Sequence, residues 1–310
     1  MEAFFDQFLG GIADLFPEGS FPAQLFNLRA LLALTLVGCI CGLMGSMVVG
    51  SRMAFFSDAL AHCAFAGVSI GFLFFEMLFG GQGKDEGNFW LTVTPLMIFF
   101  GAVVGLGIAQ VRHRTRLGSD TVIGVFFAGS LGLAAALSQL VRKRRLFNLE
   151  EFLFGDPLQV RSSDLIFLSL ALLLVCLFLR FFFNGLVLGS FNSSLAQSRK
   201  IRHTLLQHGF IILLAIVVNL SLRIVGVLLI NALLIVPAAT AMNWSKNLRQ
   251  MFWLTIAISL TTSLMGLFLS WECATAGYPL GTSGAIVLLN VALFTVSLFS
   301  LREGNPQRAL

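Results

Sequence analysis

The feature that most constrains this chain is a series of apolar runs, each about 20 residues long, that recurs along its whole length. A run of that length is what an α-helix needs to cross the hydrocarbon layer of a membrane, which is about 30 Å thick. Hydrophobic residues make up 57% of the 310 positions and charged residues only 11%. Soluble domains carry about 25% charged residues, so a water-soluble domain is excluded.

The apolar runs predict an all-α polytopic membrane protein with eight or nine transmembrane helices in one bundle. A β-barrel is excluded, because barrel strands alternate polar and apolar residues, whereas 165–183 and 210–220 are apolar on every face. We therefore predict a single transmembrane domain over residues 1–310. The nine candidate spans cover residues 26–50, 54–79, 91–111, 121–141, 164–183, 205–222, 224–242, 250–271 and 281–301.

The distribution of charge predicts how the chain is oriented. Residues 1–22 are acidic and carry apolar side chains at helical spacing, which is typical of a short helix lying in the membrane interface. Most basic clusters fall on the opposite side of a nine-span topology, as expected for cytoplasmic loops and not for a nucleic-acid surface. The N-terminus is then outside the membrane and the C-terminus inside. The run Arg142–Arg145 falls on the outer side and disagrees with this rule.

Asp58 and His62 are the informative polar residues, because they lie within an otherwise apolar stretch. Their i, i+4 spacing places both side chains on one helical face. An ionisable residue in a transmembrane helix costs roughly 2.5 to 3.5 kcal/mol on insertion scales, so it usually faces a cavity or a partner. A carboxylate beside an imidazole suits zinc, manganese or iron in passage. A purely structural ion pair is the alternative.

Two other stretches carry unusual residues. The span 223–244 contains Asn231 and Pro237, which suit either a helix that bends beside a pathway or a plain packing kink. The segment Glu150–Val160, with its Gly-Asp-Pro turn, suits either a re-entrant or docking element on the outer side or an ordinary loop.

The sequence contains no G-x-x-x-x-G-K-[ST] phosphate loop, no H-E-x-x-H motif and no CxxC pair. We therefore expect a transport subunit without ATPase activity of its own, and no permanently bound cofactor. Two other function classes stay open at this point. One is a stand-alone secondary cation transporter or channel, and the other is a membrane scaffold.

Five stretches, in the same order along the chain, resemble the zinc- and manganese-uptake permease family of ATP-binding-cassette importers, over roughly residues 30–300. The R-M-x-x-x-x-D-A-L-A-H element is the most specific of them. The stretches are RMAFFSDALAHCAFAGVSIG, SDTVIGVFFAG, EEFLFGDPLQV, RIVGVLLINALLIVPAATAMNW and YPLGTSGAIVLL.

This resemblance implies a permease of the bacterial plasma membrane that pairs with a second copy of itself or with a homologous permease. It also implies that the permease binds two cytoplasmic ATPases and receives metal from an extracytoplasmic metal-binding protein. It implies that Asp58 and His62 contact the metal in transit. It also implies that residues 184–204 form the cytoplasmic coupling segment. The residues expected there to contact the ATPase are Ser194, Ala196, Gln197, Arg199 and Lys200.

Overall fold

The computed structural model describes residues 2–17, 19–51, 53–79, 86–115, 117–142, 153–191 and 203–303. This part of the chain is helical and contains no strand, which confirms the predicted all-α class. The α-helices are α1 (Glu2–Ala13), α2 (Leu25–Gly50), α3 (Ala54–Phe79), α4 (Glu86–Arg114), α5 (Ser119–Arg142), α7 (Ser162–Phe191), α9 (His203–Trp244), α10 (Leu248–Thr275) and α11 (Thr282–Glu303). Two short 3-10 helices, η1 (Phe21–Ala23) and η2 (Pro157–Gln159), precede α2 and α7.

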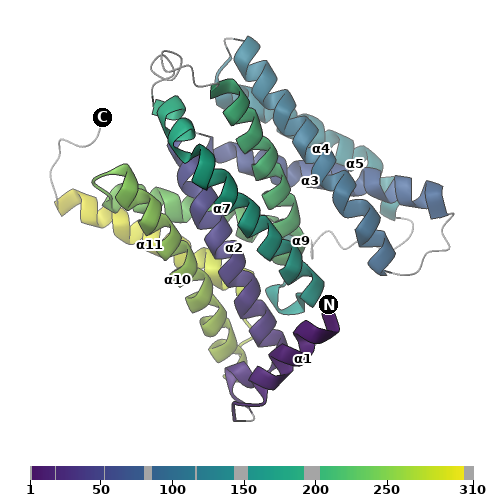
Figure 1. Cartoon of the computed structure of the whole chain (residues 1–310), viewed down its shortest axis with the longest axis vertical. Helices are drawn as coiled ribbons and strands as arrows, with labels where there is room; N and C mark the ends of the chain where they lie inside the picture. Colours follow the sequence, from purple (N-terminus) through teal and green to yellow (C-terminus); the bar gives the residue numbers. More distant parts are fainter. Residues whose placement is uncertain are drawn as a thin grey trace. The chain divides into compact units, whose positions relative to one another are not determined.

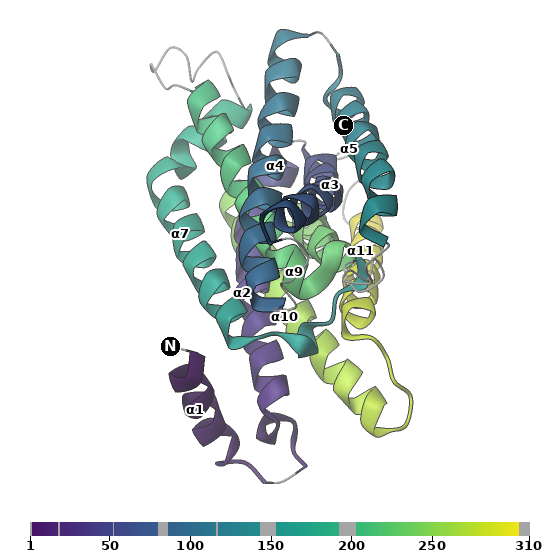
Figure 2. The same cartoon turned by 90° about the vertical axis from the view of Figure 1, so that its right-hand side faces the viewer.

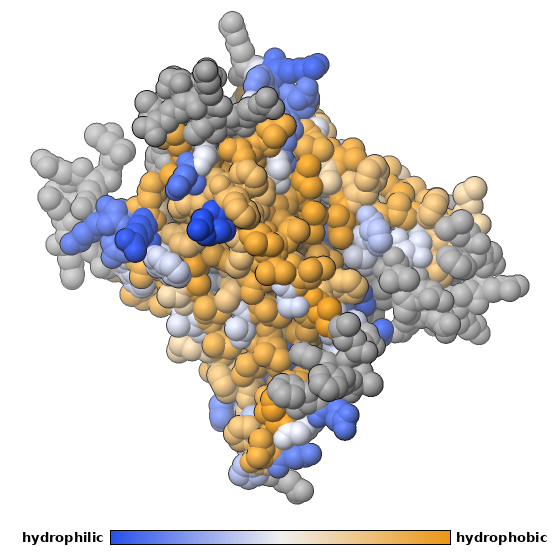
Figure 3. All heavy atoms as spheres, viewed as in Figure 1, coloured by the Kyte–Doolittle hydropathy of each residue, from blue (hydrophilic) through white to orange (hydrophobic). Residues whose placement is uncertain are grey.

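Eight of the described helices, α2 to α11, are long and apolar enough to cross a membrane. The surface in Figure 3 agrees, because hydrophobic side chains cover most of the face shown and hydrophilic ones gather in a few clusters. The chain is therefore a multi-pass membrane protein. The short helix α1 is not one of the eight, so residues 2–13 form a helix within the predicted interfacial segment.

Nine runs were expected and eight helices are found, because the sixth and seventh runs both belong to α9. A straight helix of 42 residues would be about 60 Å long, roughly twice the hydrocarbon thickness, but α9 is kinked. Its backbone leaves the helical conformation at Gly226, where φ is 80° and ψ is 165°. The two predicted spans thus form one element whose break lies three residues after Arg223.

Gly226 also permits a close contact with the segment before η2. A Cβ added at Gly226 would lie 2.5 Å from the backbone nitrogen of Gly155, which itself has a φ of 60°. Asp156 follows directly and caps η2, because its side chain accepts a hydrogen bond of 3.1 Å from the Leu158 amide. The predicted Gly-Asp-Pro turn is thus a capped turn packed on the break in α9.

The described chain divides into two compact units, and α7 and α9 run through both. Unit 1 comprises residues 1–50, 153–177 and 224–310, and unit 2 comprises 51–152 and 178–223. In unit 1, α10 packs between α2 and α11 (Figure 1). The approach of α10 to α2 is close, since a Cβ at Gly42 would lie 2.7 Å from Ile256 Cα.

Several polar side chains in unit 1 form hydrogen bonds between helices. The Ser259 hydroxyl on α10 donates to the Gly38 carbonyl on α2 at 2.9 Å. Thr262 donates to the Asn290 amide oxygen on α11 at 3.2 Å, and Asn243 donates to Ser297 at 2.9 Å. Hydrogen bonds of this kind hold transmembrane helices together where apolar packing alone provides little specificity.

In unit 2, α3 lies between α4 and α5 (Figure 2). Its close approach to α4 depends on small residues, since a Cβ at Gly67 would lie 2.9 Å from Met97 Cα. Residues 59–69 of α3 are buried except His62. This burial leaves one narrow open face on the first half of α3, and the candidate site lies on that face.

Candidate functional site

The open face of α3 carries the two residues singled out in the sequence. Between residues 54 and 69 the side chains that are not buried are those of Ala54, Phe55, Asp58 and His62. Phe55, Asp58 and His62 follow one another at i, i+3 and i+7, which is one stripe of a helix. Phe55 is 63% exposed, and the side chains of Asp58 and His62 are 37% and 21% exposed.

The pair lies nearer the start of its helix than the apolar stretch suggested. α3 begins at Ala54, so Asp58 opens the second turn and does not sit at the centre of the span.

His62 is held from one side by Asp58. Its Nδ1 lies 2.9 Å from the Asp58 backbone oxygen and 3.4 Å from Oδ1 of the Asp58 carboxylate. A backbone carbonyl can only accept a hydrogen bond, so Nδ1 carries the proton. In the neutral imidazole Nε2 then has the lone pair, which is the arrangement that histidine metal ligands use.

None of the polar contacts found for the described His62 side chain involves Nε2. The contacts of the ring itself are aromatic. Phe65 on the same helix lies 6.1 Å away between ring centroids, and Phe127 on α5 lies 4.8 Å away at an interplanar angle of 63°. Phe127 falls within a stretch that resembled the permease family, but the sequence did not indicate that it contacts His62.

Two ligands do not complete a metal site. Among the described residues, no group of three or more His, Cys, Asp or Glu is placed to hold a metal ion. Four ligands are usual for zinc, so the pair needs further donors from water, a substrate complex or another chain. The structure brings Asp58 and His62 together as predicted, while their role as ligands stays a prediction.

The other predicted site residues have different outcomes. Asn231 and Pro237 lie in the helical stretch of α9 that follows the break at Gly226. Their role beside a pathway stays a prediction. α7 continues to Phe191, so the first part of the expected coupling segment is helical. Ser194, Ala196, Gln197, Arg199 and Lys200 lie outside the described residues, as do residues 143–145 of the basic run.

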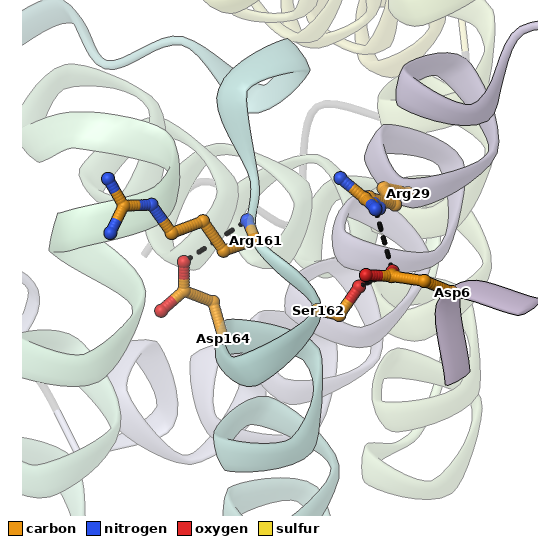
Figure 4. A network of polar contacts seen from close by, with 5 residues as sticks. All are labelled: Asp6, Arg29, Arg161, Ser162 and Asp164. Carbon is orange, nitrogen blue, oxygen red and sulfur yellow. Dashed lines mark hydrogen bonds and ion pairs between the residues drawn. The ribbon is translucent and has the colours of Figure 1, made fainter. Parts of the chain in front are cut away.

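A second polar cluster, which the sequence did not indicate, connects α1 to α2 and α7 within unit 1 (Figure 4). The Asp6 carboxylate on α1 accepts a 2.6 Å hydrogen bond from the Arg29 guanidinium on α2. Asp6 also accepts one from the hydroxyl of Ser162, the first residue of α7. Together these donors lower the pKa of Asp6, with the Ser162 bond contributing most and the Arg29 charge adding to it.

The same cluster caps α7. The Asp164 carboxylate accepts a 3.3 Å hydrogen bond from the Arg161 backbone amide, which lies just before the helix (Figure 4). This is the return half of a capping box, in which an acidic side chain in the first turn satisfies the N-cap amide. The one signal of the cluster in the sequence is Arg29, a single basic residue inside an apolar run.

Comparison with known proteins assigns this chain to a family. Residues 24–300 match the ABC 3 transport family. The chain is 28% identical to the manganese transport system membrane protein MntC of Listeria innocua, covering 90% of this chain and 92% of that protein. It is 30% identical to the high-affinity zinc uptake system membrane protein ZnuB of Haemophilus influenzae, covering 87% and 95%.

A solved structure supports the same assignment. PsaBC from Streptococcus pneumoniae, determined in complex with a Fab, contains a chain that superposes with a TM-score of 0.72 at 26% identity. The superposition covers 89% of this chain and 93% of that one. With 277 of its 310 residues inside the family match, this chain belongs to the ABC 3 transport family.

Proposed function

We propose that this chain is the membrane-spanning permease subunit of an ATP-driven importer, and that Asp58 and His62 bind the metal as it passes. The importer carries a divalent transition metal, zinc, manganese or iron, across the bacterial plasma membrane. Similarity to membrane subunits named for manganese and zinc transport supports this function. The single observation that carries the site is the open stripe on α3, where a carboxylate and an imidazole face the same way.

The intrahelical contact between Asp58 and His62 is also what a purely structural ion pair would show. The contact uses only Nδ1 of His62. A structural pair has no need to leave the other nitrogen on an open face, whereas a metal ligand does. The geometry therefore favours metal binding over a purely structural role.

The missing donors fit a second permease copy. A two-fold axis beside the open stripe would bring two Asp58–His62 pairs together and make four donors, the number of a tetrahedral site. Water would complete the shell when manganese or iron is carried. Weak binding is required for transport, since metal held as tightly as in a structural zinc site would not leave.

In the proposed importer the energy comes from a separate cytoplasmic ATPase, since this sequence holds no phosphate loop of its own. Residues 184–204, with Ser194, Ala196, Gln197, Arg199 and Lys200, are proposed to bind that ATPase, and an extracytoplasmic metal-binding protein is proposed to deliver the metal. Co-purification of an ATPase with the full-length chain tests the first of these partners. A stand-alone transporter would purify without one and still move metal.

Uptake of radioactive Mn²⁺ and Zn²⁺ by cells that depend on this chain tests the proposed site. Asp58→Asn and His62→Ala are each expected to reduce uptake to background while the amount of protein in the membrane is unchanged. His208→Ala is a matched control, because His208 Nδ1 makes the same i, i+4 contact with a backbone oxygen, Thr204 O at 2.6 Å. Near-normal uptake by the Asp58→Asn, His62→Ala double variant would contradict the metal assignment.

A further inference from the structure

The imidazole of His62 is contacted from a neighbouring helix as well as by Asp58. The Phe127 ring on α5 meets it edge to face, with centroids 4.8 Å apart and an interplanar angle of 63°. Aromatic pairs prefer this arrangement, in which the positive edge of one ring points at the negative face of the other. The contact therefore favours one orientation of the imidazole over others.

A buried hydrogen bond fixes α5 against α3 at the same level. The Cys63 thiol donates to the Ser130 hydroxyl oxygen at 2.9 Å, and both residues are buried. Cys63 follows His62 directly on α3, while Ser130 lies three residues after Phe127 on α5, on the same helical face. This bond keeps Phe127 in register with His62.

The two contacts restrict different motions of the imidazole. Asp58 holds the Nδ1 edge through the backbone oxygen at 2.9 Å, but the ring can still pivot about that hydrogen bond. Phe127 packs against the ring and opposes the pivot. Outer-shell groups that orient a histidine ligand in this way typically change metal affinity or activity about 10- to 100-fold when removed.

We propose that Phe127 is a positioning residue, which holds the His62 imidazole so that Nε2 is presented to the transported metal. The proposal rests on the proposed function of the Asp58–His62 pair. It extends that function by assigning a role to α5, a helix that is otherwise largely exposed. Phe127 does not bind the metal, because a phenyl ring offers no donor atom for it.

The neighbouring residue supplies a matched control. Phe126 lies on the same helix and is partly buried like Phe127, but its ring faces α4, 3.0 Å from the position of a Cβ added at Gly107. Replacing either phenylalanine with alanine removes the same side chain from α5. The Phe127→Ala change alone removes the contact with His62.

The test measures Mn²⁺ and Zn²⁺ uptake over a range of metal concentrations in cells carrying the full-length chain and its native partners. Phe127→Ala is expected to raise the half-saturating concentration about 10-fold. The maximal rate should stay within about twofold, because the residue affects how well the ligand is presented and not the turnover of a loaded importer. Phe127→Tyr keeps the ring and should restore the wild-type value, while Phe126→Ala should leave it unchanged.

Two results would overturn the proposal. One is a half-saturating concentration in Phe127→Ala equal to that of Phe126→Ala, and the other is a lower maximal rate with no change in that concentration. If the Phe127→Ala protein does not accumulate in the membrane, the half-saturating concentration and maximal rate of Phe127→Leu are compared with those of Phe126→Ala instead. If Asp58→Asn loses uptake but Phe127→Ala has the wild-type half-saturating concentration, only the role of Phe127 is rejected. Normal uptake by Asp58→Asn would reject the proposed function itself.

Discussion

Asp6 pairs with Arg29 and Asp58 pairs with His62. The two pairs are about equally exposed, but their surroundings differ. The Asp6 and Arg29 side chains are 38% and 23% exposed, and those of Asp58 and His62 are 37% and 21% exposed. Asp6, however, connects three helices, because its partners lie on α2 and α7. The contact between Asp58 and His62 stays within one helix.

This comparison shows that partial exposure does not identify a functional pair in a membrane protein. A pair whose partners come from several helices fixes tertiary structure, and its loss should affect stability. A pair whose ion contact lies within one turn of helix, on a partly exposed stripe, can present its side chains to a ligand. We therefore expect the two pairs to respond in opposite ways to the same kind of substitution.

The largest expected effect is on transport. Asp58→Asn should abolish metal uptake with little change in the thermal unfolding midpoint of the purified protein, because the asparagine side chain has almost the same size. His62→Ala should also abolish uptake, with only a small fall in the midpoint from the lost ring contact with Phe127. Differential scanning fluorimetry in detergent, run beside the uptake assay, gives both values. A large fall in the midpoint with either variant would assign the pair to structure instead.

Asp6→Asn should show the reverse pattern. Metal uptake is expected to stay near the wild-type level, while the unfolding midpoint at neutral pH falls by about 1 to 2 °C, a small effect because the pair is partly exposed. Asp14→Asn, an exposed aspartate in the turn after α1, is the control and should not change the midpoint. Equal midpoints for the Asp6→Asn and Asp14→Asn variants would show that the Asp6 cluster does not stabilise unit 1.

The smallest expected effect is a pH dependence of that midpoint difference. The pKa of Asp6 is lowered in the folded protein, chiefly by the Ser162 hydrogen bond, so its ionised form stabilises the fold. This stabilisation is fully present above the ordinary aspartate pKa of about 3.9 and is lost as the pH falls through the lower folded value. The difference between wild type and Asp6→Asn should be constant near neutral pH and shrink below about pH 4. A difference that grows on acidification would contradict the assigned direction.

The sequence predicts the helices well, because a run of apolar residues of spanning length leaves few alternatives in a membrane. The predicted run 54–79 and helix α3 coincide, and Asp58 and His62 stand out as ionisable residues in that run. The sequence placed the boundary between the sixth and seventh spans at Arg223, whereas the structure has one helical element with its break at Gly226, because a local backbone conformation is not set by the apolar pattern. The partners of Asp6 depend on tertiary packing, which residue spacing does not reveal.

The proposed role of Phe127 was not predictable from the sequence for a related reason. α5 is apolar around most of its circumference, so periodicity does not indicate which side faces α3. Only the structure shows that Phe127 and Ser130 face His62 and Cys63. Residues that orient a ligand without touching the metal are hard to find when their helix lacks a polar face.

The most direct test of the central claim is zinc-edge X-ray absorption spectroscopy of the purified full-length protein, loaded with Zn²⁺ and carrying a purification tag without histidine. We predict an imidazole scattering signal in the wild type and in His208→Ala, and its loss in His62→Ala. An imidazole signal of wild-type strength in His62→Ala would contradict the claim that His62 binds the transported metal.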